Sequence, residues 1–331
     1  MKKCLLYLLT VLCVSSLLVS CSDDDDNKSG WENVSGTYDS TRTLSIHLDD
    51  ATLPLGNKTV EVSASSADQV VLTLYNVVPE TSTLQVTASS QQTGDVLSLS
   101  GESATTDGSV QVTGTFEKGK LSLVVHRQIT SDVAGQWKVK MTAAGASVYA
   151  NLVTGNPQLD ALSAMAGPLV GGLIAQKVEY VYSDLQANGV MGVAWKSRAS
   201  DQPVDLSMFT NALSLQYCVR DGQLLIAIDK AYTDLLALAD SKLSEFGLSA
   251  EMLTSSLIDL GGYYALPMGY QMQNGDATFY LTKEVLVPTM QMAMPLLMNK
   301  IPEAYQGLVS SLLPALQNAE SLDFGLVFEK R

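Results

Sequence analysis

The feature that most constrains the fold is the alternation of apolar and polar residues between Trp31 and Arg127. Successive side chains of a β-strand point to opposite faces of a sheet, so this pattern predicts strands with one buried face. The region shows no helical period of useful length. We expect about seven or eight short strands here, typical of an all-β domain. They begin within the runs 43–48, 58–62, 69–75, 83–86, 95–99, 109–114 and 120–125.

Turn residues separate these runs. Asp107-Gly108 and Lys118-Gly119 lie where a hairpin needs residues that tolerate positive φ. Short antiparallel strands in this number form either a sandwich or a closed barrel, and the pattern alone does not separate the two.

The second half of the chain mixes strands with helices. Apolar residues recur at helical spacing over 159–174 and 305–316, which predicts two helices that each bury one face. A helical hairpin is expected over 232–260, broken at Gly247 and capped by Ser249. A further helical segment, 287–301, is kinked or bounded by Pro288, Pro295 and Pro302. The closing alternation over 322–329 predicts a final strand that completes the sheet.

The length of 331 residues favours two domains, because a single hydrophobic core stops growing near about 250–300 residues. We place an all-β domain at 31–130 and an α+β domain with inserted helices at 131–331. The net charge of −14 and the lack of a basic stripe argue against nucleic acid as a partner.

The first twenty residues have the order of a secretory signal peptide. Lys2 and Lys3 precede an apolar stretch that is too short for a retained membrane span. Leu18-Val19-Ser20-Cys21 then resembles a bacterial lipobox, which implies cleavage before Cys21 and lipid on its thiol. The alternative is an ordinary secretory peptide with an incidental cysteine. We expect a lipoprotein that is attached to the outer membrane by acyl chains.

An acidic tether, 21–30, follows the cleavage site. Ser22, Asp23, Asp24, Asp25 and Asp26 form a solvated, self-repelling run that holds the domains off the bilayer. A serine followed by acids at this place also resembles the lipoprotein export signal of Bacteroidota. That resemblance implies a cell-surface location, and periplasmic retention is the alternative.

The two halves open with similar residues. Val34-Ser35-Gly36-Thr37-Tyr38 is echoed by Val133-Ala134-Gly135-Gln136-Trp137. Gly-x-Trp on a first strand resembles the opening of lipocalin-like, or calycin-like, barrels, and the leader resembles that of Bacteroidota lipoproteins. The chain therefore resembles the uncharacterised lipocalin-like surface lipoproteins of that phylum. The resemblance implies two β-barrel modules and a ligand cavity. The helices of the second half depart from a plain lipocalin.

Methionine and tyrosine residues of the second half form a candidate apolar ligand surface. Met290, Met294 and Met298 lie on one predicted helical face with Leu297, and stripes of methionine suit varied apolar partners. The strand around 263–272 adds aromatic and thioether groups. Its candidate residues are Tyr263, Tyr264, Met268, Tyr270 and Met272. The alternative is that these side chains fill the core.

No motif points to catalysis. Cys218 lies in an alternating strand and is expected to be a buried thiol, and His47 and His126 lie in strands without clustered carboxylates. A phosphate loop, a nucleophile elbow and a calcium loop are absent from the sequence. We expect a non-enzymatic protein without a metal or cofactor.

These observations predict an outer-membrane lipoprotein that binds an apolar or amphipathic small molecule, or an envelope protein. The alternatives are a glycan-binding accessory lipoprotein and a structural subunit of an envelope complex. Sugar sites usually stack on exposed aromatic rings, and the body of the chain offers only Trp31, Trp137 and Trp195 as tryptophans.

Overall fold

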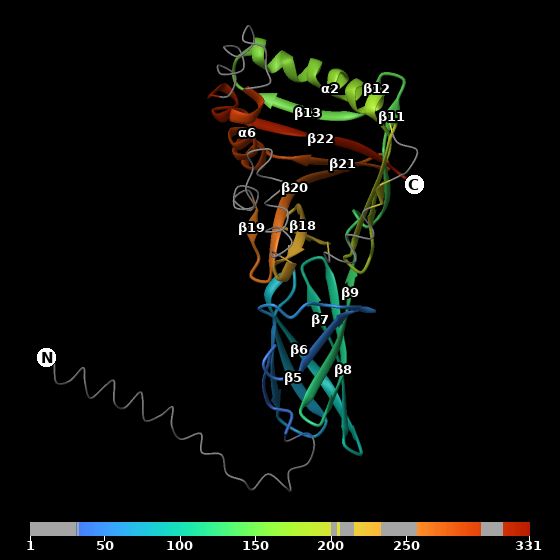
Figure 1. Cartoon of the computed structure of the whole chain (residues 1–331), viewed down its shortest axis with the longest axis vertical. Coiled ribbons are helices and arrows are strands. Elements are labelled where there is room, and N and C mark those ends of the chain that lie inside the picture. Colours follow the sequence, from blue (N-terminus) through green and yellow to red (C-terminus); the bar gives the residue numbers. More distant parts are fainter. Residues whose placement is uncertain (1–30, 32, 200–203, 206–214, 233–256, 299–313) are drawn as a thin grey trace, which may run out of the picture.

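The computed structural model describes residues 31, 33–199, 204–205, 215–232, 257–298 and 314–331. These residues form two modules stacked end to end, each built on one curled sheet (Figure 1). All but one of the strand pairs are antiparallel. The prediction of a β-rich, mainly antiparallel fold is confirmed.

The first module contains a nine-stranded sheet with the order β1-β4-β5-β6-β7-β8-β9-β2-β3. The strands are β1 (Gly36–Tyr38), β2 (Leu44–Leu48), β3 (Ala51–Thr52), β4 (Thr59–Ala64), β5 (Gln69–Val78), β6 (Thr81–Thr93), β7 (Val96–Thr105), β8 (Gly108–Glu117) and β9 (Lys120–Ile129). The short strands β1 and β3 raise the number above the expected seven or eight.

The connection between β1 and β2 explains why this sheet curls. The two strands lie near opposite ends of the sheet order, yet only residues 39–43 join them. A connection of that length spans at most about 20 Å, so the two ends of the sheet must approach each other. A bridge between Asp39 and Thr43 and the parallel pairing of β2 with β9 bring them together. The result is a barrel-like module.

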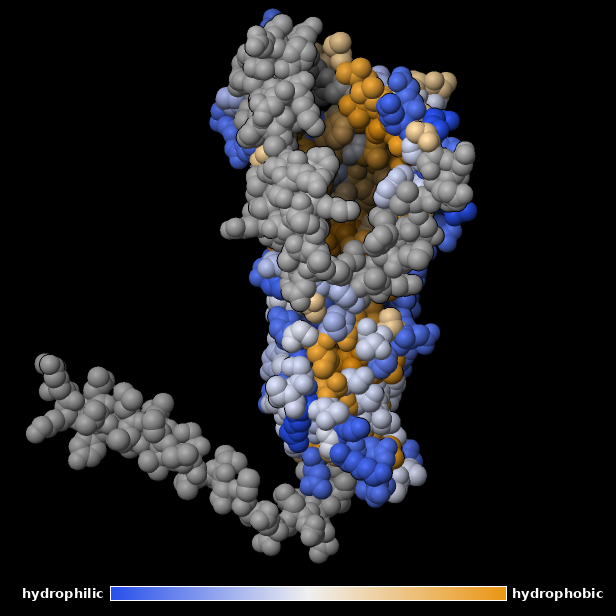
Figure 2. Space-filling model, viewed as in Figure 1, coloured by the Kyte–Doolittle hydropathy of each residue, from blue (hydrophilic) through white to orange (hydrophobic). Residues whose placement is uncertain are grey.

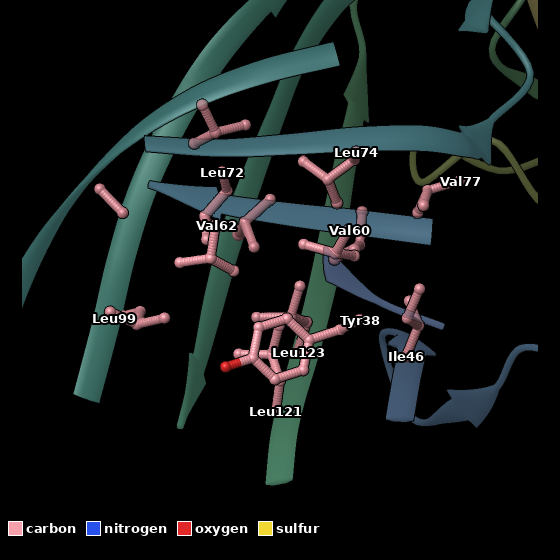
Figure 3. Packing of buried hydrophobic residues seen from close by; sticks show 14 of the residues in the cluster. Tyr38, Ile46, Val60, Val62, Leu72, Leu74, Val77, Leu99, Leu121 and Leu123 are labelled. Atoms are coloured by element: carbon pink, nitrogen blue, oxygen red, sulfur yellow. The ribbon is translucent and has the colours of Figure 1, made fainter. Parts of the chain in front are cut away.

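Branched aliphatic side chains fill the inside of this module. Along β5, Val70, Leu72 and Leu74 are buried and alternate with more exposed residues, as the sequence pattern predicts. Figure 3 shows such side chains converging from several strands, with the ring of Tyr38 among them.

One hairpin in each half has the same kind of turn. Lys118 and Gly119 have φ of 50° and 79°, and Asp221 and Gly222 have φ of 53° and 76°. Two successive residues with positive φ form the type I′ turn that suits the twist of a hairpin.

The expected hairpin at Asp107-Gly108 forms between β7 and β8, but neither residue has positive φ. Gly108 is needed for a different reason. A Cβ atom there would lie 1.8 Å from the carbonyl oxygen of Gln128 on the paired strand. The strands approach too closely at this point for any larger residue.

The second module contains an 11-stranded sheet with the order β16-β15-β14-β10-β22-β21-β20-β18-β17, in which β13 also pairs with β22 and β19 with β20. Its strands are β10 (Gly135–Val139), β13 (Val148–Val153), β14 (Val178–Leu185), β15 (Met191–Ser197), β16 (Val204–Asp205), β17 (Gln216–Arg220), β18 (Gln223–Asp229), β19 (Ile258–Asp259), β20 (Tyr263–Gln273), β21 (Asp276–Leu281) and β22 (Ser321–Lys330). A small hairpin of β11 (Met141–Thr142) and β12 (Gly145–Ala146) and a 3₁₀ turn, η1 (Lys230–Tyr232), complete it. The final strand β22 pairs with β10, β13 and β21, as predicted.

Helix α2 (Pro157–Lys177) forms where the sequence predicts a helix, but it does not bury the predicted face. Met165, Leu169 and Leu173 are 70%, 67% and 51% exposed. The helix packs through small residues instead. A Cβ at Gly171 would lie 2.2 Å from the carbonyl oxygen of Ala146 in β12. This close approach places the larger apolar side chains outside.

The other predicted helices have mixed outcomes. Helix α6 (Lys283–Met298) begins earlier than the predicted 287 and continues through Pro288 and Pro295. The predicted end of the helical hairpin is wrong, because Ile258–Asp259 form strand β19, which pairs with β20. Its central part, 233–256, and most of the predicted helix 305–316 lie outside the described residues.

Candidate functional site

Each module opens with a buried aromatic plug at its first strand. The hydroxyl of Tyr38 donates a hydrogen bond to the carbonyl of Val34 at 2.7 Å, and the indole Nε1 of Trp137 donates to the carbonyl of Val133 at 2.8 Å. Both bonds reach back four residues, and both rings are buried, with exposed fractions of 0% and 1%. The polar tip of each ring is satisfied locally, so the rest of the ring can pack in the core.

The surroundings of the two plugs are also alike. Tyr38 packs edge to face against Phe116 at 6.1 Å between ring centroids, and Trp137 packs in the same way against Phe279 at 6.2 Å. A cation lies over each ring: the Arg42 guanidinium over Tyr38 and the Lys330 ammonium over Trp137. The two modules thus share the same arrangement of a buried ring, a phenylalanine and a cation at the first strand.

Beyond its plug, the second module contains a partly open cavity of about 320 Å³. Figure 2 shows an apolar hollow in the upper module, coloured orange. In the described part of the chain, the walls come from six strands: β14, β15, β18, β20, β21 and β22. The lining residues are Val181, Tyr182, Ser183, Leu185, Met191, Val193, Leu224, Ile226, Met268, Phe279, Tyr280, Leu281, Phe324, Gly325, Leu326 and Phe328.

Alternation along each strand turns apolar side chains toward this cavity. Leu224 on β18 lies directly across from Met268 on β20, and Phe279 on β21 lies across from Leu326 on β22. Side chains opposite each other in register share one face of the sheet. At the closed end, Phe279 contacts Phe328 with ring centroids 5.2 Å apart. The cavity therefore ends on an aromatic cluster that includes the Trp137 plug.

Few polar groups reach the cavity. Among the described residues that line it, hydroxyl groups are present only on Ser183, Tyr182 and Tyr280, and no lining side chain carries a charge at neutral pH. The Tyr182 ring stacks on Tyr180 with centroids 4.4 Å apart, and the Tyr280 ring packs against Tyr149 at 5.0 Å. This chemistry suits an apolar guest.

Of the surface predicted from sequence on β20, only Met268 lines the cavity. Tyr270 and Met272 pack on the adjoining apolar cluster of the same module. Tyr264 lies under the Lys230 ammonium, 4.7 Å from the ring centroid. Tyr263 lies at the junction between the modules, where its hydroxyl donates to the carbonyl of Val77 at 2.7 Å. Burial raises the pKa of Tyr263.

The methionine stripe lies on α6, which packs beside β21 and β22. Met290 is partly buried and does not line the cavity. The side chains of Met294, Leu297 and Met298 lie outside the described residues.

Sequence reasoning missed most of the cavity. Its walls come from segments as far apart as Val181 and Phe328, and each described strand contributes only one to four lining residues. The alternation in those strands was visible, but the direction in which the sheet curls was not. Local pattern tells which residues share a face, and the curl decides which face is concave.

The junction between the modules is polar and buried. The Arg127 guanidinium donates twice to one carboxylate oxygen of Glu80, and also to the Gln216 side chain at 3.0 Å and the Tyr217 carbonyl at 2.8 Å. Burial raises the pKa of Glu80, and the positive charge of Arg127 opposes this shift. Arg127 and Glu80 belong to the first module, whereas Gln216 and Tyr217 lie on β17 of the second. The network therefore joins the first sheet to the second.

A second buried ion pair lies in the same junction. Lys58 Nζ is 2.5 Å from Asp229 Oδ2, and both side chains are 0% exposed. Burial lowers the pKa of Lys58, while Asp229 opposes the shift. Lys58 belongs to the first module and Asp229 to β18, so this pair also ties the two sheets together.

The remaining candidate groups do not form a reactive site. Cys218 is fully buried on β17, as expected, and burial raises the pKa of its thiol to about 12. His47 contacts the hydroxyls of Ser45 and Thr52, and His126 pairs with Asp49 at 2.6 Å. Within the described ranges, no group of three or more His, Cys, Asp or Glu residues is placed to hold a metal.

Comparisons of the chain with protein-family models, with curated proteins and with solved structures found no match. No helix in the described part of the chain is long and apolar enough to cross a membrane.

Proposed function

We propose that this protein is a non-enzymatic, lipid-anchored outer-membrane protein that binds an apolar small molecule in the cavity of its second module. The observation that carries the proposal is the cavity of about 320 Å³ with its apolar walls. Ligand pockets commonly measure about 300–1,000 Å³ and have mostly hydrophobic walls with a few polar groups.

The difference between the interiors of the two modules supports this function. The first module has the same kind of plug, yet aliphatic side chains occupy its interior. An unfilled apolar space in a folded protein loses packing contacts, at a cost of about 24 cal/mol per Å³. A guest that fills the space restores those contacts, which is why engineered apolar cavities bind small apolar molecules.

The leader and the acidic tether support the location. Lipid on Cys21 would anchor the chain, and the run Ser22–Asp26 would keep the modules in water on the cell surface. A Cys21→Ala variant should leave the membrane fraction and appear as soluble or unprocessed protein. Recovery of that variant in membranes at the wild-type level, with the mature N-terminus at another residue, would overturn the anchoring proposal, and protease treatment of intact cells tests the surface location.

Ligand binding is tested with the neutral fluorescent probe N-phenyl-1-naphthylamine and purified protein that begins at Ser22. We expect saturable fluorescence enhancement at one site. Val193→Phe places a ring in the cavity and should weaken binding at least about ten-fold, equivalent to 1.4 kcal/mol. Val153→Phe is the matched control, because Val153 is 37% exposed on β13 and does not line the cavity.

Equal probe binding by both variants would show that the probe binds elsewhere, and absence of binding by the wild-type protein would count against the function. The alternatives, glycan binding and a structural role in an envelope complex, remain predictions. A glycan array and a pull-down from solubilised membranes test them.

A further inference from the structure

We infer that the cavity selects an uncharged apolar ligand with one hydroxyl or carbonyl group, which the Ser183 hydroxyl holds, and that it discriminates against fatty-acid-like anions. This inference rests on the proposed function and names the ligand class of the same site. It follows from two observations, the absence of a cation in the described lining and the placement of Ser183.

The described lining offers a carboxylate no cation with which to pair. Two described cations, Arg331 and Lys330, lie over aromatic rings of this region. Arg331 lies 4.5 Å from the centroid of the Tyr182 ring, and Lys330 lies 5.9 Å from that of Trp137. Both are exposed, and neither lines the cavity. Trp137 itself separates Lys330 from the Phe279 and Phe328 cluster at the closed end.

A buried charge without a partner is strongly unfavourable, so an acid would enter such a cavity only in its protonated form. A carboxyl group with a pKa of about 4–5 is more than about 99% ionised at pH 7. If the protonated acid binds like the matching alcohol, its apparent affinity at pH 7 should be about 100-fold weaker. An ammonium ligand is excluded for the same reason.

Ser183 supplies the polar contact. It lies on the inner face of β14 between Val181 and Leu185, directly across from Trp137 on one side and Val193 on the other. Ser183 is only 8% exposed and lines the cavity, and no hydrogen bond from its hydroxyl to another described residue is present. The hydroxyl is accessible from the cavity, since the buried side-chain atom without a partner in the described part of the chain is Glu80 Oε2. A ligand hydroxyl or carbonyl would satisfy the Ser183 hydroxyl, which explains a serine in a wall of valine, leucine and phenylalanine.

The test compares three ligands with the same chain length: 1-decanol, decanoate and decylammonium. Each competes with N-phenyl-1-naphthylamine for protein that begins at Ser22, at pH 7 and at physiological ionic strength. We expect decanol to displace the probe and the two ions to be at least about 100-fold weaker. Decanoate should gain about ten-fold for each unit by which the pH falls toward its pKa.

Ser183→Ala should weaken decanol about five-fold more than it weakens the probe, because decanol alone presents a hydroxyl to Ser183 and loses one hydrogen bond. Ser122→Ala on β9 of the first module is the matched control and should change neither. If decanoate displaces the probe as well as decanol does, or if Ser183→Ala weakens decanol no more than the probe, the inference is wrong while the proposed function stands. If neither the probe nor any of the three ligands binds, the proposed function fails and the inference with it.

Discussion

The two modules begin alike and differ in what they enclose. Tyr38 and Trp137 are plugs with the same reach-back hydrogen bond, the same edge-to-face phenylalanine and a cation over the ring. A glycine with positive φ stands two residues before each plug, with φ of 140° at Gly36 and 148° at Gly135. Behind one plug lies a filled aliphatic core, and behind the other lies a cavity.

Strand number does not account for this difference. Each sheet has a continuous order of nine strands, and the second reaches 11 only because β13 and β19 pair beside that order. In the first module, side chains such as Val60 and Leu72 belong to one buried aliphatic cluster. In the second, residues of similar size, such as Val193 and Ile226, line the cavity. The same glycine and aromatic plug thus occur at the start of a filled module and of a hollow one.

The largest expected effect comes from removing the plugs. Trp137→Ala and Tyr38→Ala should each lower the free energy of unfolding by about 3–5 kcal/mol, because each deletes a fully buried ring. Urea denaturation followed by circular dichroism measures both. Trp137→Phe and Tyr38→Phe, which keep a ring and lose the hydrogen bond, serve as controls and should cost about 1 kcal/mol. If the alanine variant of one plug lost no more free energy of unfolding than its phenylalanine variant, the two plugs would not be equivalent.

The junction offers the next effect. Lys58→Ala leaves Asp229 buried without its partner and should destabilise the protein by about 3 kcal/mol. Since the pair joins the modules, the variant should also separate their unfolding into two transitions, visible by calorimetry. The double variant Lys58→Met with Asp229→Leu removes both charges and should regain most of the loss. A single transition with unchanged midpoint in Lys58→Ala would show that the two modules are coupled by other contacts.

The alternation between Trp31 and Arg127 predicted the first module well, because each strand there has one buried and one exposed face. The failures have local physical causes. Gly108 looked like a turn residue and is required by a close approach between strands. Met165, Leu169 and Leu173 looked like a core face, but α2 packs through Gly171 instead. Spacing shows which residues share a face and does not show how near the neighbouring backbone lies.

The site was harder to predict than the fold. Met268 was visible as a candidate because it stands in a run of aromatic and thioether residues. Leu224, Phe279 and Leu326 have no local signal that separates them from ordinary core positions. Ser183, the residue on which ligand selection is proposed to depend, is one serine among many. It gains meaning only once the curl of the sheet places it beside Val193 and Trp137.

The same substitution in both modules separates a filled interior from a hollow one. Val112 on β8 is fully buried in the first core, so Val112→Phe overpacks it and should cost about 1–3 kcal/mol. Val193 lines the cavity, where a phenyl ring has room, so Val193→Phe should change the free energy of unfolding by less than about 0.5 kcal/mol. Urea denaturation of the two variants measures the difference directly. If Val193→Phe cost as much as Val112→Phe, the second module would be as tightly packed as the first, and the contrast between them would disappear. If it were the milder change, as expected, the space that ligands are proposed to occupy would be established independently of any ligand.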